Sequence, residues 1–427
     1  MAFQQGLSGL NAASKSLDVI GNNIANANTT GFKSSRAEFA DMVASAMGLA
    51  GGSDAGIGVQ VADIAQQFTR GNISTTGNNL DVAIDGGGFF KLQQADGSMA
   101  YTRAGNFQLD KAGNLVTNNN AKVLGYTVDP TTGKPISGAD PVPLVFPTAA
   151  PIAAKQTSKI TLGLNLDARA PDAAGDPAAT PPIPATPRTT YSTSINVYDS
   201  QGVAKPVNLY FQKNSANNTW DVYDQLDDAT ATPPVVATPI GQVTFDNNGA
   251  ILTPAPVAPS TEHLLSLTVN PSPPNPNGLP AFPVSINLDK VTQYGSKFAV
   301  STQSQDGYAA GELTSVNIED SGMVMATYSN GVTRAEAQLA LANFRNPQGL
   351  RPIGGNNWVE TFESGAPVVG TPGTGSLGAL RSGALEDSNV DLTAELVNLM
   401  TAQRYYQANA QTIKTQDQVM STLVNLR

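Results

Sequence analysis

Apolar residues recur at every seventh position at both ends of this chain. The N-terminal positions are Phe3, Leu10, Leu17 and Ile24, with Leu7, Ala13 and Ile20 beside them. The C-terminal positions are Leu392, Leu399, Tyr406, Ile413 and Met420, with Leu396, Ala410 and Val424 beside them. A seven-residue repeat keeps one apolar stripe on a slightly underwound helix, which favours contact between helices. The pattern therefore predicts that the chain begins and ends in helices that pair as a coiled coil.

The remaining surface of both helices carries very little charge. Residues 1–30 contain only Lys15 and Asp18, and residues 396–413 contain only Arg404. A helix with one face in water normally has charged residues on that face. The composition favours helices that are surrounded by copies of the same protein. The alternative is an ordinary helix pair that closes the monomer.

The terminal helices contain few large apolar residues for their length. Burying one such side chain contributes roughly 1.5–3 kcal/mol, whereas ordering one residue costs about 1–2 kcal/mol in backbone entropy. Chain ends with this balance stay mobile until a partner holds them. We expect both ends to be disordered in the free monomer and to fold on assembly.

The segments next to the helices are rich in Asn and Gly. The run at 26–33, Asn-Ala-Asn-Thr-Thr-Gly-Phe-Lys, is typical of a helix stop. After it we expect a short helix around 35–47, a glycine-rich turn over 48–58 and a strand over 59–68. Near the other end we expect a flexible Gly/Thr/Ser linker over 365–383. The last helix should begin near Asp391, with Asn389 or Ser388 as its cap.

Alternating apolar and polar residues dominate the middle of the chain. Residues 80–126 and 306–362 are predicted to be β-meanders, and 155–300 an all-β insertion with proline-rich loops. The predicted fold is mainly β with α-helical termini, in discontinuous nested domains. These domains are a terminal helical coiled-coil domain (1–30 and 386–427), a connecting segment (31–75 and 365–385), an inner β-rich domain (76–150 and 301–364) and an outer all-β insertion domain (151–300).

Composition narrows the classes of function. The net charge of −10 argues against nucleic acid and anionic membranes as partners. There is no apolar run of about 18 residues, as a membrane span requires. The absence of cysteine excludes disulfides and thiolate chemistry, and a single histidine, His263, argues against a catalytic triad or a histidine metal cluster. No cleaved signal peptide is recognisable, so we expect a cytoplasmic protein or one exported without a cleaved leader.

Two glycine-rich runs and one acidic turn are the candidates for ligand chemistry. The runs at 84–90 and 370–375 lack the lysine that ends a phosphate-binding loop, so structural turns are favoured. The run 246–249, Asp-Asn-Asn-Gly, lacks the glutamate that completes a calcium loop. We therefore predict no catalytic, metal or cofactor site, and no enzyme.

Both terminal runs resemble the signatures of the bacterial flagellar rod and hook axial protein family. The N-terminal resemblance covers 7–13 and 21–33, and its motif residues are Asn22, Asn23, Asn26, Asn28, Thr30, Gly31, Phe32 and Lys33. The C-terminal resemblance covers 383–392, 395–397 and 402–409. The ending at 412–417 resembles hook members in particular, as do 80–90, 101–110, 305–308 and 341–350. The match spans about half of the chain.

This resemblance implies a structural subunit of the flagellar hook. Such subunits self-assemble into a curved, flexible tube, a universal joint that transmits torque from the basal-body rod to the filament. The implied partners are further copies in a helical homopolymer, the distal rod protein, the hook cap protein, the hook–filament junction protein and the type III export apparatus. The implied location is the flagellar basal body and hook, outside the cell after export, without membrane insertion.

On this reading the functional residues lie in an assembly interface. The candidates are Phe3, Leu7, Leu10, Leu17, Ile20, Ile24, Leu392, Leu396, Leu399, Tyr406, Ile413 and Met420. The nearest alternative is a distal rod protein, which shares both signatures but generally lacks a large outer insertion. A secreted β-rich adhesin or glycan-binding module does not explain the paired heptads, and a hydrolase has no supporting motif.

Overall fold

The protein is described by a computed structural model that covers residues 2–43, 56–129, 132–136, 138–146, 151–171, 174–176, 183–186, 191–214, 218–226, 237–256, 260–270 and 279–425. The chain divides into two compact units. The terminal unit comprises Met1–Ala149, Leu313–Thr327 and Thr333–Arg427, and the insertion unit comprises Ala150–Glu312 and Tyr328–Val332. Residues from both ends of the chain thus build one unit, and the insertion unit interrupts it.

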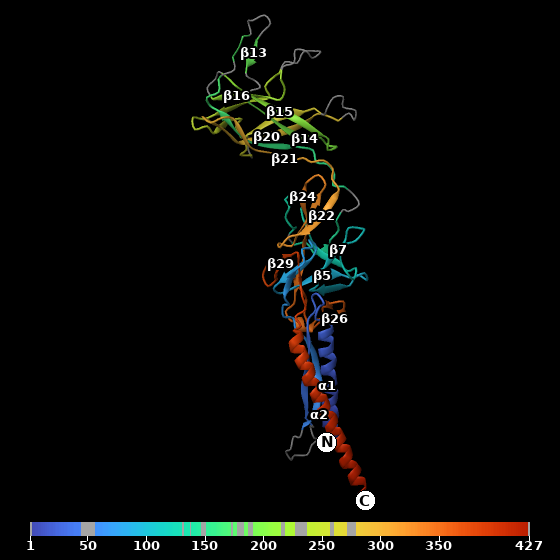
Figure 1. The fold of residues 1–427 in the computed structure, drawn as a ribbon. Coiled ribbons are helices and arrows are strands. Elements are labelled where there is room, and N and C mark those ends of the chain that lie inside the picture. The colour runs from blue at the N-terminus through green and yellow to red at the C-terminus, as the bar shows by residue number, and fades with distance from the viewer. Residues whose placement is uncertain are drawn as a thin grey trace. The chain divides into compact units, whose positions relative to one another are not determined.

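The terminal unit begins and ends with its two long helices (Figure 1). Its N-terminal elements are α1 (Ala2–Ala25), β1 (Ser35–Val43), β2 (Gly56–Gln66), β3 (Ile73–Thr75), β4 (Val82–Asp85), β5 (Phe89–Gln93), β6 (Met99–Thr102), β7 (Phe107–Leu109), β8 (Leu115–Thr117), β9 (Lys122–Thr127) and β10 (Val142–Pro143). Its C-terminal elements are β22 (Leu313–Ile318), β23 (Met323–Tyr328), β24 (Thr333–Leu339), β25 (Leu341–Asn343), η1 (Pro347–Gly349), β26 (Arg351–Gly354), β27 (Asn357–Val359), β28 (Val368–Gly370), β29 (Ala379–Ser382), β30 (Ala384–Glu386) and α2 (Leu392–Asn425).

The insertion unit is built from strands in the described residues. They are β11 (Lys159–Asp167), β12 (Ala174–Asp176), β13 (Ile183–Thr186), β14 (Tyr191–Tyr198), β15 (Ala204–Lys213), β16 (Thr219–Tyr223), β17 (Gly241–Phe245), β18 (Ile251–Thr253), β19 (Leu264–Val269), β20 (Phe282–Tyr294) and β21 (Ala299–Gln305). The predicted all-β character of this region is confirmed.

Helices α1 and α2 lie against each other, and α1 also lies against the antiparallel hairpin of β1 and β2 (Figure 1). The prediction of a short helix around 35–47 is wrong over 35–43, which forms β1, while 44–47 lie outside the described residues. The β-branched residues of β2, among them Val59, Val61 and Ile64, give β1 a paired partner strand, and this tertiary pairing overrides local preference. The predicted strand over 59–68 is confirmed over most of its length by β2.

The β part of the terminal unit joins strands from both ends of the chain. Its largest sheet runs in the order β22-β23-β24-β9-β5-β6-β27-β26, while β3 pairs with β30 and β4 pairs with β29. One buried cluster contains Phe90, Leu115 and Leu339. A second is aromatic, with Phe89, Tyr101 and Trp358 in edge-to-face contacts with their neighbours.

The C-terminal approach to α2 is more ordered than its composition suggested. The predicted flexible linker over 365–383 contains β28, which pairs with β25, and β29, which pairs with β4, so that prediction is wrong there. The predicted caps are wrong too. The Asp391 carboxylate accepts hydrogen bonds from the N–H groups of Thr393 (2.9 Å) and Ala394 (3.1 Å) and caps the helix.

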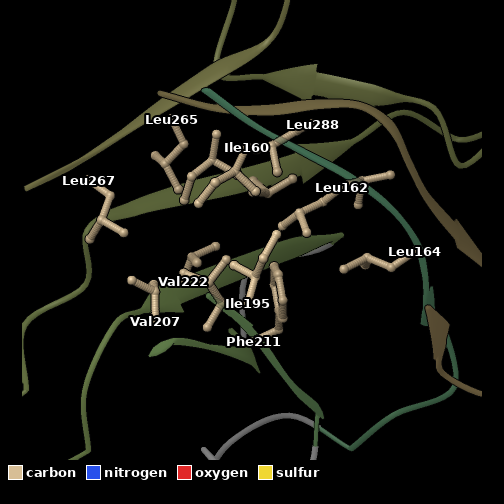
Figure 2. Close-up of a cluster of buried hydrophobic side chains, with 14 of the residues drawn as sticks. Ile160, Leu162, Leu164, Ile195, Val207, Phe211, Val222, Leu265, Leu267 and Leu288 are labelled. Atoms are coloured by element: carbon tan, nitrogen blue, oxygen red, sulfur yellow. The ribbon is translucent and has the colours of Figure 1, made fainter. Parts of the chain in front are cut away.

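The insertion unit encloses a core of its own. One sheet runs in the order β19-β20-β11-β21 and the other in the order β14-β15-β16-β17-β18. Figure 2 shows side chains of both sheets meeting, such as Leu162 from β11 and Phe211 from β15. The alternation at Tyr191, Thr193, Ile195 and Val197 places Ile195 and Val197 in this core.

Candidate assembly surface

The two terminal helices meet along a seam of small and polar residues. A side chain added at Gly9 would lie 2.8 Å from the Asn409 side chain, so the two helix surfaces nearly touch there. Seven residues later on α1, Ser16 lines a common cavity with Ala402. Seven further, Asn23 donates from Nδ2 to Glu395 Oε1 at 3.1 Å. Along the seam, the residue numbers increase on α1 and decrease on α2, so the two helices are antiparallel. Their contacts recur every seven residues on both helices.

The seven-residue period was predicted, and the predicted Ile413 lies at the seam, where a side chain added at Gly6 would lie 3.2 Å from its Cγ1. The other seam residues were not predicted: Gly9, Ser16 and Asn23 against Asn409, Ala402 and Glu395. The predicted N-terminal residues Leu10, Leu17 and Ile24 each follow a seam residue by one position and are half-buried. Gly9, Ser16 and Asn23 have the same seven-residue spacing in the sequence. The prediction was based on large apolar side chains, and it therefore selected the neighbouring stripe of Leu10, Leu17 and Ile24.

Most of the predicted C-terminal residues, and the first N-terminal ones, face away from this seam. Among the predicted residues Ile20 is buried, and Leu399 and Ile413 are half-buried. The exposed members are Phe3, Leu7, Leu392, Leu396, Tyr406 and Met420. Val397, Met400 and Tyr405 are exposed as well, although the heptad pattern did not identify them. The helix pair therefore presents many large apolar side chains to its surroundings.

Helix α2 extends beyond α1. By the spacing of the seam, Ala2 at the start of α1 lies level with Gln416 on α2. The rest of α2, to Asn425, continues past the end of α1 for about 13 Å at 1.5 Å per residue. Val419 and Met420 lie on this extension and are exposed. Helix α1 therefore does not cover the C-terminal end of α2.

The seam is also incompletely filled. A cavity of about 440 Å³ lies between α1, α2 and β1, lined by residues that include Ile20, Asn23 and Glu395. A second cavity of about 370 Å³ is lined by Ala12 and Ala13 of α1, Phe39 of β1 and Tyr405 of α2, with others. Both hollows are open to solvent and are not enclosed voids. The helix pair alone therefore does not make a closed core.

Several family motif residues connect α1 to the rest of the terminal unit. The buried Asn23 accepts at Oδ1 from the N–H of Ser35 (2.9 Å) and donates from Nδ2 to the carbonyl of Ser35 (2.8 Å), in addition to its bond to Glu395. A single amide thus joins α1, β1 and α2. Asn22 accepts at its carbonyl from Asn26 Nδ2 at 2.9 Å, which closes the last turn of α1.

The end of the motif turns the chain into the β part of the unit. Gly31 has φ +69, and its N–H donates to the carbonyl of Glu386 at 2.8 Å. A Cβ at this position would lie 2.6 Å from the backbone nitrogen of Ala104, so only glycine fits. The carbonyl of Thr30 accepts from Asn356 at 2.9 Å. Of the remaining motif residues, Phe32 is half-buried and Asn28 is exposed.

The last motif residue, Lys33, belongs to a buried ionic cluster. Its Nζ donates to Glu386 Oε1 at 2.6 Å and to the carbonyl of Thr69 at 2.8 Å. Arg103 Nη1 donates to the other carboxylate oxygen at 3.3 Å, and its guanidinium lies over the Phe89 ring. The Glu386 side chain is 0% exposed. This junction joins residues that are hundreds of positions apart in the sequence.

One carboxylate faces two cations in this cluster, and burial shifts the pKa of both cations. Burial lowers the pKa of Lys33 below its usual value, while the charge and hydrogen bond of Glu386 oppose that shift. Burial lowers the pKa of Arg103 in the same way, again against Glu386. Glu386 also accepts from the N–H of Gly71 at 2.9 Å. Sequence reasoning recognised Lys33 as a motif residue but missed Arg103 and the pairing role of Glu386, which no local pattern reveals.

Within the described residues, His, Cys, Asp and Glu side chains do not gather in groups of three or more as a metal centre requires. No helix in the described ranges has the length and apolar character needed to cross a membrane. The site with the most support is thus the exposed apolar surface of the helix pair.

Comparisons with protein families match most of the chain. The matching models are described as flagella basal body rod protein (3–33), flagellar hook protein FlgE/F/G D1 domain (83–162), flagellar basal body protein FlaE D2 domain (165–308) and flagellar basal body rod FlgEFG protein C-terminal (381–426). These models cover both helices and strands of both units.

Full-length relatives and a solved structure are similar to this chain. The flagellar hook protein FlgE of Salmonella typhimurium is 42% identical over 443 residues, and that of Escherichia coli K12 is 43% identical over 433, each covering 100% of both chains. The crystal structure of Helicobacter pylori flagellar hook protein FlgE2 matches 73% of this chain and 100% of its own, with a TM-score of 0.51. At 17% identity, that likeness concerns the fold alone.

The relatives decide between the two axial components that the sequence left open. The Treponema pallidum flagellar hook protein FlgE is 34% identical over 460 residues and is matched over 98% of its length. Hook proteins thus match along the whole chain, the insertion unit included. Such proteins are structural components of the flagellum. The chain belongs to the flagellar hook protein family, and it is a hook subunit rather than a distal rod protein.

Proposed function

We propose that copies of this chain polymerise through their terminal helices into the curved, flexible tube of the hook, the universal joint that carries torque from the rod to the filament. The observation that carries the proposal is the exposed apolar surface of the paired helices, where Leu7 is 45% and Met420 60% exposed. Large exposed apolar surface marks sites of association. In the polymer, neighbouring copies would cover Phe3, Leu7, Leu10, Leu17, Ile20, Ile24, Leu392, Leu396, Leu399, Tyr406, Ile413 and Met420, or complete the core beneath them.

The energetics favour assembly over a closed monomer. A seam of Gly, Ser, Ala and Asn buries little apolar area, whereas each large side chain covered by a neighbour contributes roughly 1.5–3 kcal/mol when fully buried. Part of this gain is offset by the entropy lost on association. The extension of α2 past α1 adds Val419 and Met420 to the surface that needs a neighbour.

The finer organisation follows from the same proposal. The terminal domain (1–30 and 386–427) would form the inner tube, joined by the connecting segment (31–75 and 365–385) to the inner β domain (76–150 and 301–364) and the outer domain (151–300). Subunits would leave the cell through the type III export apparatus without a cleaved signal peptide. They would assemble on the distal rod protein, beneath the hook cap protein, and end at the hook–filament junction protein. The low charge of the terminal helices supports their placement in the inner tube, where neighbouring copies would surround them.

The test is a charge placed on the exposed face of α1. Leu7→Asp should leave the thermal unfolding of the purified monomer unchanged to within about 0.5 kcal/mol, because the side chain is exposed there. It should abolish polymer, because a carboxylate would be buried without a partner in the tube wall. Sedimentation of the purified chain and electron microscopy of complemented basal bodies measure the two results.

Val203→Asp is the matched control, since Val203 is 55% exposed and lies in the insertion unit. This variant should polymerise normally. Hooks of ordinary number and length in the Leu7→Asp strain would rule out the helical tube wall. In cells that lack the gene, basal bodies should have complete rods without hooks.

A further inference from the structure

Phe362 is the most exposed large apolar side chain among the described residues. Its relative exposure is 103%, as much as in an isolated peptide, so the phenyl ring contributes nothing to the fold of the monomer. Single exposed apolar residues are common and need no explanation by themselves. This one differs because the backbone that carries it is held firmly in place.

A network of hydrogen bonds fixes the turn 361–364 around it. The Thr361 N–H donates to Ser364 Oγ (2.9 Å), and Ser364 Oγ donates back to the Thr361 carbonyl (2.9 Å). The N–H groups of Glu363 and Ser364 both donate to Thr361 Oγ1. Ser364 is 1% exposed. The turn is therefore closed by its own side chains.

The turn is also anchored to the segment before β26. Thr361 Oγ1 donates to the carbonyl of Gly349 at 2.6 Å, and Asn346 Nδ2 donates to the carbonyl of Glu363 at 3.1 Å. A Cβ on Gly349 would lie 2.5 Å from the Ser364 nitrogen, so the close approach depends on glycine. A rigid, preformed turn lowers the entropy that its apolar residue loses when it is buried in a partner.

Further exposed apolar and charged residues lie in or beside the segments that hold the turn. Val368 is exposed and pairs with Asn343, three residues before Asn346, so a second apolar side chain flanks the same segment. Exposed charges of both signs, Arg345 and Glu363, lie in or beside these segments. Apolar residues together with charged residues at their margin are typical of protein interfaces.

We propose that Phe362 is an anchor through which the β part of one subunit docks onto a second copy of this chain, in addition to the contacts between terminal helices. The inference rests on the proposed polymer. A second copy is the occupant favoured here because the turn belongs to the same unit as the exposed helix pair, and because a rim with both charge signs suits contact between identical chains. This anchor would connect neighbouring copies through a contact separate from those of the terminal helices α1 and α2.

The first experiment compares the polymerisation of purified full-length variants. Phe362→Asp should raise the critical concentration for polymer at least about tenfold, while Phe362→Leu stays within about threefold of the unchanged chain. Val203→Asp, the same charge on exposed apolar surface of the insertion unit, should have no effect. Equal critical concentrations for Phe362→Asp and the unchanged chain would overturn the proposal, and so would equal shifts for Phe362→Asp and Val203→Asp.

A second measurement keeps the phenyl ring and does not depend on the stability of Phe362→Asp. The chain has no cysteine, so Glu363→Cys introduces a single thiol beside the anchor. Its reaction with a bulky maleimide should be at least tenfold slower in polymer than in monomer, whereas the thiol of Val203→Cys, a control outside the anchor, should be slowed less. Equal rates at position 363 in monomer and polymer would show that no copy covers the turn.

The two proposals fail in different ways. If the unchanged chain forms no polymer under any condition, the proposed function fails before the anchor is tested. If polymer forms with the Leu7 dependence expected but Phe362→Asp assembles like the unchanged chain, the helical wall stands and the anchor is wrong.

Discussion

The insertion unit and the terminal helix pair solve the problem of burial in opposite ways. In the insertion unit, two sheets enclose a core in which Ile160, Leu162 and Val222 are completely buried (Figure 2). In the terminal helix pair, small residues form the seam, and large ones such as Leu396 and Met420 are exposed. The first region completes its core within one chain, whereas the second leaves large apolar side chains uncovered.

The insertion unit also covers parts of the edges of its two sheets. Between β14 and β21, Gln303 Nε2 donates to the carbonyl of Ser194 and its Oε1 accepts from Thr193, so two edge strands are joined by one side chain. At the opposite edge, Ala250 of the β17–β18 turn pairs with Thr292 of β20. Edges closed in this way offer little backbone for pairing with another chain.

The junction at Glu386 gives the largest expected effect on a single chain. Glu386→Gln would leave Lys33 and Arg103 buried without an anion, which should destabilise the terminal unit by about 3–5 kcal/mol. In urea unfolding followed by circular dichroism, the transition of the terminal unit should shift and that of the insertion unit should not.

Glu363→Gln is the control for the junction, because that carboxylate is exposed and its loss should change stability by less than about 0.5 kcal/mol. If Glu386→Gln were as stable as the unchanged chain, the ionic cluster would not hold the two chain ends together. The contrast between a self-sufficient and a dependent region would then need another structural basis.

A core substitution in the insertion unit should give the converse result. Leu162→Ala removes a completely buried side chain and should cost about 3 kcal/mol in the stability of that unit. The exposed Leu252→Ala is the matched control, with an expected change below about 0.5 kcal/mol. Because the insertion unit has its own core, Leu162→Ala monomers should still polymerise at temperatures where this unit stays folded. Loss of polymer under those conditions would mean that the two units depend on each other.

Acid should weaken the insertion unit through Asp306, and this is the smallest expected effect. Partial burial acts to raise the pKa of Asp306, but hydrogen bonds from Lys159 and Ser158, with Lys155 nearby, outweigh it and hold the pKa below the usual 3.8. Because the folded pKa is lower, the unfolded chain binds more protons as the pH falls through 3.8. The stabilisation is therefore present above pH 3.8 and is lost below it. In Asp306→Asn, the stability measured by urea unfolding should vary less with pH between 5 and 3; an unchanged pH dependence would exclude this role.

Much of the fold was predictable because local patterns report local structure. The seven-residue spacing predicted both terminal helices, and alternation predicted the strands that carry Ile195 and Val197. The helix stop before Gly31 was predictable because the positive φ there needs glycine. The β1 strand was not, because its stability comes from pairing with β2 and from α1, and not from its own composition.

Sequence alone determined the helical ends, the β-rich middle, the family motif and the absence of cysteine, since these follow from periodicity, composition and short runs of residues. Only the tertiary structure decided which heptad positions form the seam, because Gly9 and Asn409 become neighbours only after the whole chain folds back. It also brought Lys33, Arg103 and Glu386 together, and left Phe362 uncovered. Burial and charge pairing depend on residues distant in sequence, and no local pattern specifies which of them will meet.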